Sequence, residues 1–346
     1  MENDILSLVI LTRNRCETLK RSLLYHCEAL SNKDLEKTIK IYVIDNGSTD
    51  NTSEYLNELC LQFKNIVVIK NGKNIGADNS LLVGLESVKS RYVWCLQDHA
   101  QVFVEQLPDI LSLLQVSDRE HTFICAPLKT INKYSSSSDQ KLHAILNSVT
   151  LNVNIFNRAL LLPFYRKHLI EFQGSGLIFF LANIEMVIHY GIERMLILPN
   201  FVTVNEQFLV PQERDKYNWQ KSFSGYTNVT LGYARIISYI IEHRILTEEI
   251  VKRFLSTSDQ GLNALRKFIR LRKIKSDDKV PIETAQIIAN VPTYSRMERY
   301  LIIKSISGSN TMLILLKFFD LFLVGYFRIK AYAKAAVRKI KSVARV

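Results

Sequence analysis

The sequence predicts a doubly wound α/β domain with a mostly parallel sheet, followed by a mainly helical C-terminal region. Continuous apolar runs indicate strands that are buried on both faces, and helix-like segments separate these runs. Polar clusters follow several of the runs directly. The composition, with 47% hydrophobic and 23% charged residues, excludes a disordered chain, and 346 residues suffice for one large domain with an appendage or for two domains.

The first hundred residues contain four such runs in order. We expect strands over 5–12, 39–44, 66–70 and 92–96, and helices over 15–30, from a cap at Thr49 or Asp50 to about 63, and over about 76–90. Strand–helix alternation favours right-handed crossovers between parallel strands, and the carboxyl ends of parallel strands lie at one edge of the sheet. Ligands of doubly wound sheets bind at that edge.

Three of the polar clusters stand at predicted strand ends, over 12–15, 45–50 and 97–99. A carboxylate in such a place can accept hydrogen bonds from a base or a ribose hydroxyl, and the two arginines of the first cluster can offset phosphate charge. Neither GxGxxG nor GxxxxGK[ST] follows the first strand, which disfavours a dinucleotide or P-loop site. The sequence therefore predicts a nucleotide held by side chains, although DNGS alone is equally typical of a plain turn.

Four motifs in this order carry a resemblance to a known family: SLVILTRNR, IYVIDNGSTDNT, NIVVIKNGKNIGADN and YVWCLQDHA. Together they resemble the family 2 glycosyltransferases with a GT-A fold, strongly from about residue 5 to 105 and weakly to about 210. The resemblance implies an inverting transferase that uses a nucleotide-activated sugar, most often a UDP-sugar.

The resemblance also implies which residues bind the donor. Asp45 matches the aspartate that meets the base, and Asp50 lies in the same loop. Arg15 belongs to the basic loop that offsets phosphate charge. The predicted donor-binding residues are Thr12, Arg13, Asn14, Arg15, Asp45, Asp50, Lys73, Asn74, Gly76 and Asp98.

The fourth motif departs from the family. Relatives commonly end this strand with LGDDD or LDADD, whose aspartates hold ribose and a divalent ion, whereas residues 96–100 here are LQDHA. Asp98 is the one carboxylate left, with His99 in a slot where an aspartate commonly binds the metal. Mg²⁺ prefers oxygen ligands and imidazole suits Mn²⁺ better. Three interpretations stay open: a Mn²⁺ or Mg²⁺ ion held by Asp98 and His99, a metal-independent site that uses Arg or Lys, or a degenerate site.

Inversion at a sugar carbon requires a general base for the acceptor hydroxyl. The family supplies it from a segment about 80 to 100 residues after the metal motif, and the closest stretch here is 179–191 (FFLANIEMVIHYG). Glu185 is the only carboxylate in that stretch. We therefore predict Glu185 as the base, with Glu171 as the alternative. A solvated helix charge is the competing interpretation of Glu185.

The formal charge of +12 is concentrated near the C-terminus. Residues 266–275 carry six basic side chains and residues 321–346 carry seven, with no acid in either, so the rest sums to 12 − 13 = −1. On a helix, the apolar and basic residues of the tail fall on opposite sides, which is typical of an in-plane membrane anchor on an anionic surface. Packing on the chain itself or on a dimer partner is the competing interpretation, and nucleic acid is disfavoured.

The remaining features suggest a cytoplasmic protein. Five cysteines lack metal-finger spacing, the acidic start is unlike a signal peptide, and Lys317 and Asp320 interrupt the longest apolar stretch. We expect a transferase domain over 1–210, a helical region over 211–311 with long amphipathic stretches at 228–257 and 259–275, and a basic tail over 312–346. The boundary is predicted near Pro211.

The sequence thus predicts a glycosyltransferase bound peripherally to the cytoplasmic face of the inner (plasma) membrane and active in polysaccharide biosynthesis. It would move a sugar from a nucleotide donor to a surface glycan or lipid-linked saccharide. A homo-oligomer is compatible with the sequence. A non-catalytic scaffold that binds nucleotide-sugar or glycan is the alternative, and a nucleotidyltransferase is disfavoured because its glycine- and lysine-rich loop is absent.

Overall fold

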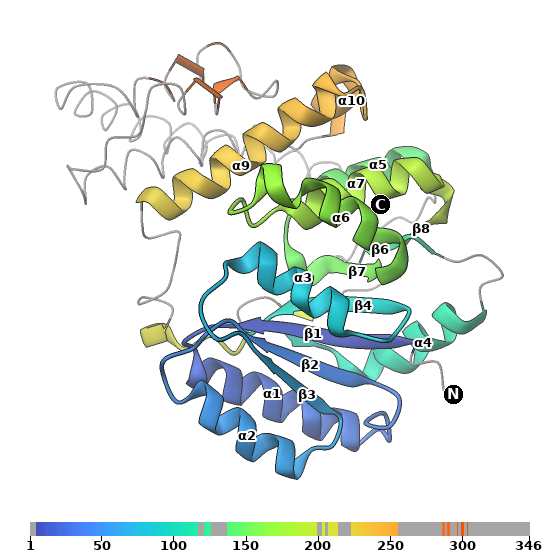
Figure 1. The fold of residues 1–346 in the computed structure, drawn as a ribbon. Helices are drawn as coiled ribbons and strands as arrows, with labels where there is room; N and C mark the ends of the chain where they lie inside the picture. The colour runs from blue at the N-terminus through green and yellow to red at the C-terminus, as the bar shows by residue number, and fades with distance from the viewer. Residues whose placement is uncertain are drawn as a thin grey trace, which may run out of the picture. The chain divides into compact units, whose positions relative to one another are not determined.

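The computed structural model describes residues 5–116, 121–125, 137–198, 203–204, 207–213 and 223–254, together with isolated positions between 286 and 303 (Figure 1). One compact unit comprises residues 1–221 and 225–255. This unit extends past Pro211, where the sequence predicted a boundary, because residues 225–255 pack with the preceding chain. Most of the second unit lies outside the described residues, so the account below concerns the first.

A seven-stranded sheet organises the unit, in the order β3-β2-β1-β4-β7-β6-β8, beside a smaller two-stranded sheet. β1 pairs in parallel with β2 and β4, whereas β7 runs antiparallel to both β4 and β6. The strands are β1 (Leu6–Thr12), β2 (Lys40–Asp45), β3 (Ile66–Lys70), β4 (Tyr92–Gln97), β6 (Phe123–Cys125), β7 (Asn154–Asn157) and β8 (Met195–Ile197). This confirms the predicted doubly wound, mostly parallel sheet.

The first four strands lie within one residue of their predicted bounds. The helices between them are α1 (Cys16–Ser31), α2 (Thr52–Gln62) and α3 (Ala77–Ser87). In Figure 1, α1 and α2 cover one face of the sheet and α3 covers the other. These strands were predictable because they are buried on both faces, which requires uninterrupted apolar runs.

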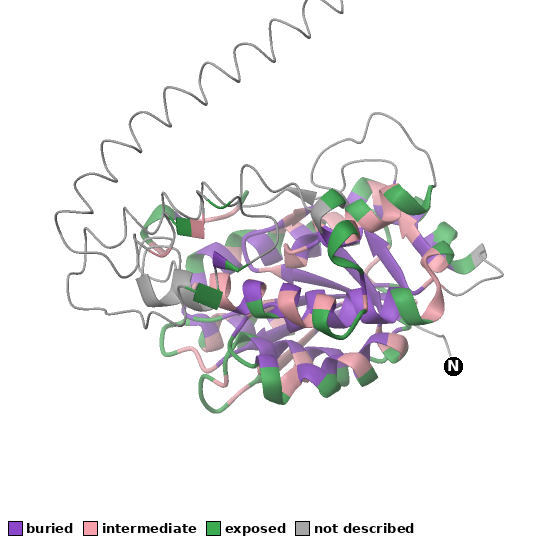
Figure 2. Ribbon diagram, turned by 90° about the horizontal axis from the view of Figure 1, so that it is seen from above, coloured by how far each residue is buried: buried purple, intermediate pink, exposed green. Residues whose placement is uncertain are grey.

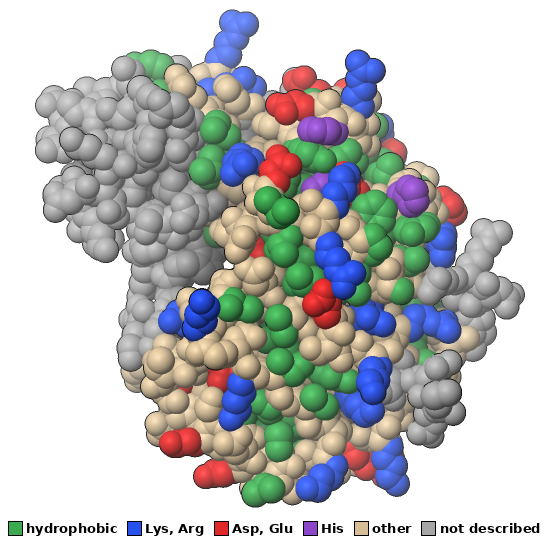
Figure 3. Space-filling model, in the orientation of Figure 1, with side chains coloured by type: hydrophobic (Ala, Val, Ile, Leu, Met, Phe, Trp, Pro, Cys, Tyr) green, Lys and Arg blue, Asp and Glu red, His purple; other side chains and the backbone are tan. Residues whose placement is uncertain are grey.

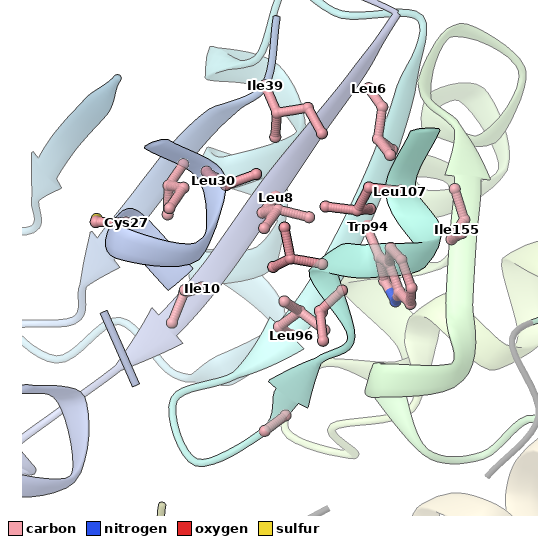
Figure 4. Packing of buried hydrophobic residues seen from close by; sticks show 14 of the residues in the cluster. Leu6, Leu8, Ile10, Cys27, Leu30, Ile39, Trp94, Leu96, Leu107 and Ile155 are labelled. Carbon is pink, nitrogen blue, oxygen red and sulfur yellow. The ribbon is translucent and has the colours of Figure 1, made fainter. Parts of the chain in front are cut away.

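Alternation along β1 divides its side chains between two layers. Leu6, Leu8 and Ile10 are fully buried against residues of α1 and of α4 (Leu107–Val116), as Figure 4 shows. Val9 points to the opposite face, where a Cβ on Gly84 of α3 would lie 2.8 Å from its Cγ1. Figure 2 shows the same burial throughout the central strands. The core therefore fixes β1 at the centre of the site described below.

The second part of the sheet is covered by α5 (Ser138–Leu146), α6 (Arg158–Phe172) and α7 (Ile178–Tyr190). All residues of α7 from 178 to 187 are buried. Phe180 of α7 stacks on Tyr233 of α9 (Phe223–Glu242), with ring centroids 6.2 Å apart. The short elements are β5 (Gln101–Val102), η1 (Val104–Gln106), η2 (Leu151–Val153), η3 (Ile192–Arg194), β9 (Thr203–Val204) and α10 (Glu248–Phe254).

The amphipathic stretch predicted over 228–257 is two helices, α9 and α10, rather than one. Arg244 has a φ of 54°, and the amide of Ile245 donates to the carbonyl of Ile240 over 2.9 Å. A left-handed residue followed by such a bond ends a helix, because the bond satisfies a terminal carbonyl that would otherwise lack a donor. The other predicted stretch, 259–275, lies outside the described residues.

Charged side chains of both signs are spread over the face seen in Figure 3. None of the helices that the structure describes is long and apolar enough to cross a membrane. The basic segments 266–275 and 321–346 lie outside the described residues.

Candidate active site

The carboxyl ends of β1, β2 and β4 meet at one edge of the sheet. Thr12 pairs with Asp45 in the β1–β2 register, and Leu11 pairs with Gln97 in the β1–β4 register. The amide of Asn46 continues the ladder by donating to the carbonyl of Thr12 over 3.0 Å. The structure therefore brings the three predicted polar clusters together.

Asp98 lies at the centre of this edge and is 3% exposed. Thr12 Oγ1 donates to Asp98 Oδ2 over 2.9 Å, and Arg15 Nη1 donates to Asp98 Oδ1 over 2.9 Å. His99 Nδ1 lies 3.2 Å from the same Oδ1 and 3.2 Å from Arg15 Nη1. We call Thr12, Arg15, Asp98 and His99 the Asp98 cluster.

The cluster decides the charge state of Asp98. Burial alone raises the pKa of a carboxyl group, because it penalises the anion. The hydrogen bond from His99, the positive charge of Arg15 and the hydrogen bond from Thr12 outweigh that penalty and hold the pKa of Asp98 below its usual value. Asp98 is therefore an anion at neutral pH, paired with the guanidinium group of Arg15.

Asp45 is also buried, and its carboxylate organises the loop after β2. Oδ1 accepts a 2.9 Å hydrogen bond from the amide of Ser48, and Oδ2 accepts one of 2.8 Å from the hydroxyl of Ser53. Asp50 is exposed and accepts from the amide of Thr52 over 3.1 Å. Both aspartates thus shape the loop.

Asn14 joins the loops after β1 and β2. Its amide donates to Ser48 Oγ over 2.9 Å, and its side-chain oxygen accepts from the amide of Thr49 over 2.7 Å. Its φ of 53° is in the left-handed region, which Asn adopts more readily than most residues. Asn14, which the sequence predicted for the nucleotide pocket, therefore also holds the loops after β1 and β2 together.

A third loop, after β3, packs against the second. Gly47 has a φ of 68°, and a Cβ there would lie 2.5 Å from the carbonyl carbon of Lys73. Asn46 Oδ1 accepts from the amide of Ile75, and Asn46 Nδ2 donates to Asn74 Oδ1, each over 2.9 Å. Lys73, Asn74 and Gly76 are exposed beside this contact, as is Arg13 in the first loop.

The N-terminus of α1 lies at the same edge, and its first amides donate hydrogen bonds to carboxylates. Asp50 accepts from the amide of Cys16 over 3.3 Å. Glu213 accepts from the amides of Glu17 and Thr18, each over 2.9 Å. Negative charge stabilises a helix N-terminus. Sequence reasoning missed Glu213, and nothing local could have identified it, because it lies almost two hundred residues from α1.

Asp78 is a second residue that sequence reasoning missed. It is buried in the first turn of α3, and its Oδ2 accepts from the amides of Gly174 (2.8 Å) and Gly176 (3.1 Å). Burial raises the pKa of Asp78 above its usual value, although these backbone hydrogen bonds oppose the shift. An acidic residue is common in a first helical turn, so its place was readable from the sequence, whereas its distant partners were not.

Glu185, the predicted base, lies between helices and is 8% exposed. Its carboxylate accepts from Lys167 Nζ (3.0 and 3.1 Å) and lies 2.8 Å from His168 Nε2 of α6. Burial opposes ionisation, but His168 and Lys167 hold the pKa of Glu185 below its usual value. In the described part of the chain, no hydrogen bond or ion pair connects Glu185 to the Asp98 cluster. Glu171 is exposed near the end of α6.

Asp98 and His99, the predicted metal ligands, do lie together in the Asp98 cluster. Among the residues that the structure describes, however, no group of three or more His, Cys, Asp and Glu side chains is arranged to hold a metal ion.

Comparison with known proteins relates part of the chain to one family. Residues 7–175 match the model for "Glycosyl transferase family 2". TarS 1–349 of S. aureus, solved with UDP-GlcNAc, has a TM-score of 0.54 and 15% identity over 90% of this chain and 91% of that one. The mannosyltransferase PcManGT of Pyrobaculum calidifontis, solved with GDP-Man and Mn²⁺, has a TM-score of 0.51 and 12% identity, covering 88% and 86%. At these identities, the likeness to solved structures is one of fold. No curated protein matches the chain.

Proposed function

We propose that the chain, whose residues 7–175 match the model for glycosyl transferase family 2, is an inverting enzyme that moves a sugar from a UDP-sugar to a hydroxyl group of a glycan or lipid-linked saccharide. The observation that carries the proposal is the convergence of three strand ends on a buried, anionic Asp98. The similar TarS and PcManGT folds, solved with UDP-GlcNAc and GDP-Man respectively, support a nucleotide-sugar as the donor.

The donor pocket would be formed by the loops after β1, β2 and β3. We assign Asp45 to the base, because Ser48 and Ser53 use two of the about four lone-pair directions of its carboxylate and leave the others for N–H groups of the base. The exposed Lys73 and Asn74 would contact the ribose and diphosphate. These roles agree with the chemistry of the side chains, since carboxylates accept hydrogen bonds from base N–H groups and cations bind phosphates.

A donor screen tests the proposal. Isothermal titration calorimetry of the full chain with UDP, GDP and their sugars should give saturable binding of one nucleotide series. Asp45→Ala should weaken that binding by about tenfold or more, because a hydrogen bond to a charged group is lost. Absence of binding by every nucleotide-sugar, or an unchanged affinity in Asp45→Ala, would contradict the proposal.

Glu185 is our candidate for the general base, with Glu171 as the alternative. An ionised carboxylate is the protonation state that a base requires, and the low pKa of Glu185 provides it at neutral pH. Glu185→Gln keeps the shape of the side chain. It should lower kcat by about 10²- to 10⁴-fold with an unchanged donor affinity, and Glu171→Gln should be nearly silent. The reverse pattern would assign the role to Glu171.

A non-catalytic scaffold that binds nucleotide-sugar remains the second candidate, because the carboxylate of Glu185 is paired with Lys167 and His168 of a neighbouring helix. Donor binding without transfer to any acceptor or to water would favour that candidate over the enzyme.

We also propose that the basic tail over 312–346 binds the anionic cytoplasmic face of the membrane. The support is the segregation of basic and apolar residues in the sequence of the tail. Removal of residues 312–346 should release the protein from vesicles that contain phosphatidylglycerol, with no change in donor affinity. Continued vesicle binding by the truncated chain would contradict the anchor. A homo-oligomer stays a prediction, and the molar mass in solution tests it.

A further inference from the structure

The carboxylate of Asp98 is already engaged inside the protein. A carboxylate has about four lone-pair directions, and three neighbouring groups point at this one. Thr12 binds Oδ2, while Arg15 and His99 both lie within 3.2 Å of Oδ1. At 3% exposure, Asp98 has little open surface for an additional ligand.

These residues do not fit a divalent cation. Mg²⁺ and Mn²⁺ favour sites rich in oxygen ligands, and carboxylates supply most of the negative charge. The described residues of the cluster offer a single carboxylate, and the guanidinium group of Arg15 lies 2.9 Å from it. An ion coordinated by Asp98 would therefore stand beside a fixed positive charge, and the attraction of one carboxylate would be offset by that repulsion.

The helix N-terminus on this edge cannot take over the role of the metal. In the described structure, Asp50 and Glu213 already accept hydrogen bonds from the amides of Cys16, Glu17 and Thr18. A phosphate at this place would meet two carboxylates rather than free amides. Phosphate binding therefore depends on side chains.

Arg15 is the side chain best placed for it. Its side chain is 19% exposed, so it is fixed by the cluster and yet reaches the surface of the site. Among the residues that the structure describes, its guanidinium group contacts Asp98 and His99 through Nη1 alone. A guanidinium group carries five N–H donors, so Nε and Nη2 remain able to donate. Arginine stays charged throughout the physiological pH range and can bind phosphate through two parallel hydrogen bonds.

We propose that Arg15, oriented by Asp98, stabilises the diphosphate leaving group in this site in place of a divalent cation. The inference rests on the proposed function. In the transfer, the acceptor oxygen forms a bond to the anomeric carbon and the bond from that carbon to the phosphate oxygen breaks. The electron pair of the broken bond stays on the nucleoside diphosphate, and the hydroxyl proton passes to the general base. Arg15 donates to the diphosphate oxygens on which negative charge develops, which is electrostatic stabilisation of the transition state.

Asp98 is then a positioning residue. Its negative charge holds the guanidinium group, and Thr12 holds Asp98. Lysine at position 15 would keep the charge without the planar pair of donors, so Arg15→Lys should recover only part of the function.

Calorimetry of the full chain with UDP, in EDTA and then in Mn²⁺, tests the inference. UDP should bind in EDTA with an affinity within about twofold of that in Mn²⁺. UDP binding that requires Mn²⁺ overturns the inference and leaves the proposed function intact. If no nucleotide binds in either condition, the proposed function fails and the inference fails with it.

Substitution of Arg15 provides the second arm. Arg15→Gln should weaken UDP binding by about 10- to 100-fold, because charge-assisted hydrogen bonds are lost. Arg166→Gln is the matched control, since Arg166 forms an exposed ion pair with Glu86 away from the cluster. An unchanged UDP affinity in Arg15→Gln overturns the inference. If Arg15→Gln fails to fold, as circular dichroism would reveal, the comparison of EDTA and Mn²⁺ on the unaltered chain still decides the question.

Discussion

The two parts of the sheet use different kinds of contact. In the first region, residues 5–102, parallel strands end in loops whose side chains bind one another, as the Asp98 cluster does. In the second region, described over 121–125 and 137–198, β7 is antiparallel and α7 is buried among other helices. The carboxylate of Glu185 in this region is paired with Lys167 and His168 of α6. The polar side chains of the first region therefore lie at the edge of the sheet, where a ligand can reach them, whereas Glu185 of the second region is paired within the helix packing.

The strongest test of the first region is the contact between its loops at Gly47. Gly47→Ala forces a left-handed φ on a residue with a Cβ and drives that Cβ into the backbone of Lys73. We expect a loss of about 4 kcal/mol of unfolding free energy and of nucleotide binding, from backbone strain and overpacking together. Chemical denaturation measures it. Gly72→Ala is the control, because nothing lies within 4 Å of its Cβ position, and equal effects of the two would refute the explanation.

The next test concerns the buried joint between α1 and β5. His26 is inaccessible to solvent, its Nδ1 donates to the carbonyl of Ser22 over 2.7 Å, and its Nε2 accepts from the amide of Val102 over 3.1 Å. Burial lowers the pKa of His26 from 6.5 to about 4, against the opposing effect of the Ser22 hydrogen bond.

The unfolded chain therefore binds a proton at His26 between pH 6.5 and 4, whereas the folded chain does not. Stability is complete above pH 6.5 and falls as the pH decreases to 4, by about 3 kcal/mol in all at about 1.4 kcal/mol per pKa unit. Urea denaturation at pH 7 and pH 4.5 measures the loss. His26→Gln should reduce the difference between the two pH values, and an identical difference in both proteins would assign it to other groups.

A smaller effect is expected at Asp78, where the two regions meet. Asp78→Ala removes the acceptor for the amides of Gly174 and Gly176 and should cost about 2 kcal/mol. Hydrogen exchange at these two amides should accelerate, while UDP affinity stays the same. Asp78→Asn keeps an acceptor and should retain part of the protection. Altered UDP affinity with unchanged exchange would show that Asp78 serves the donor site instead.

The smallest effect is expected at the exposed link between the same regions. Arg166 Nη2 donates to Glu86 Oε1 over 2.6 Å, but both side chains are largely solvated. Arg166→Gln should therefore cost less than about 1 kcal/mol, since solvent screening and side-chain entropy offset the attraction. Thermal unfolding measures it. A loss of stability as large as that of Asp78→Ala would contradict the expectation that the exposed ion pair contributes less than the buried hydrogen bonds.

The first region was largely predictable from the sequence. The four strands are apolar runs because both faces of a parallel sheet are buried, and the motifs after them stand at the same edge because the strands are parallel. The second region was less predictable. Strands of three or four residues, such as β6 and β7, leave no periodic pattern, and the end of α9 depends on a left-handed conformation at Arg244.

The sequence by itself determined the parallel half of the sheet, the edge on which the polar clusters gather and the loss of a carboxylate at residues 98–100. Local periodicity and strand order suffice for the first two features, and the resemblance to the family's fourth motif suffices for the third. Only the tertiary structure decided which partners the polar side chains have. Arg15 reaches Asp98, Glu213 caps α1 and Asp78 holds the loop at Gly174, each across more than eighty residues. Contacts at such separations leave no periodic trace in a single sequence, because they arise from the packing of whole elements and not from the local conformation of the chain.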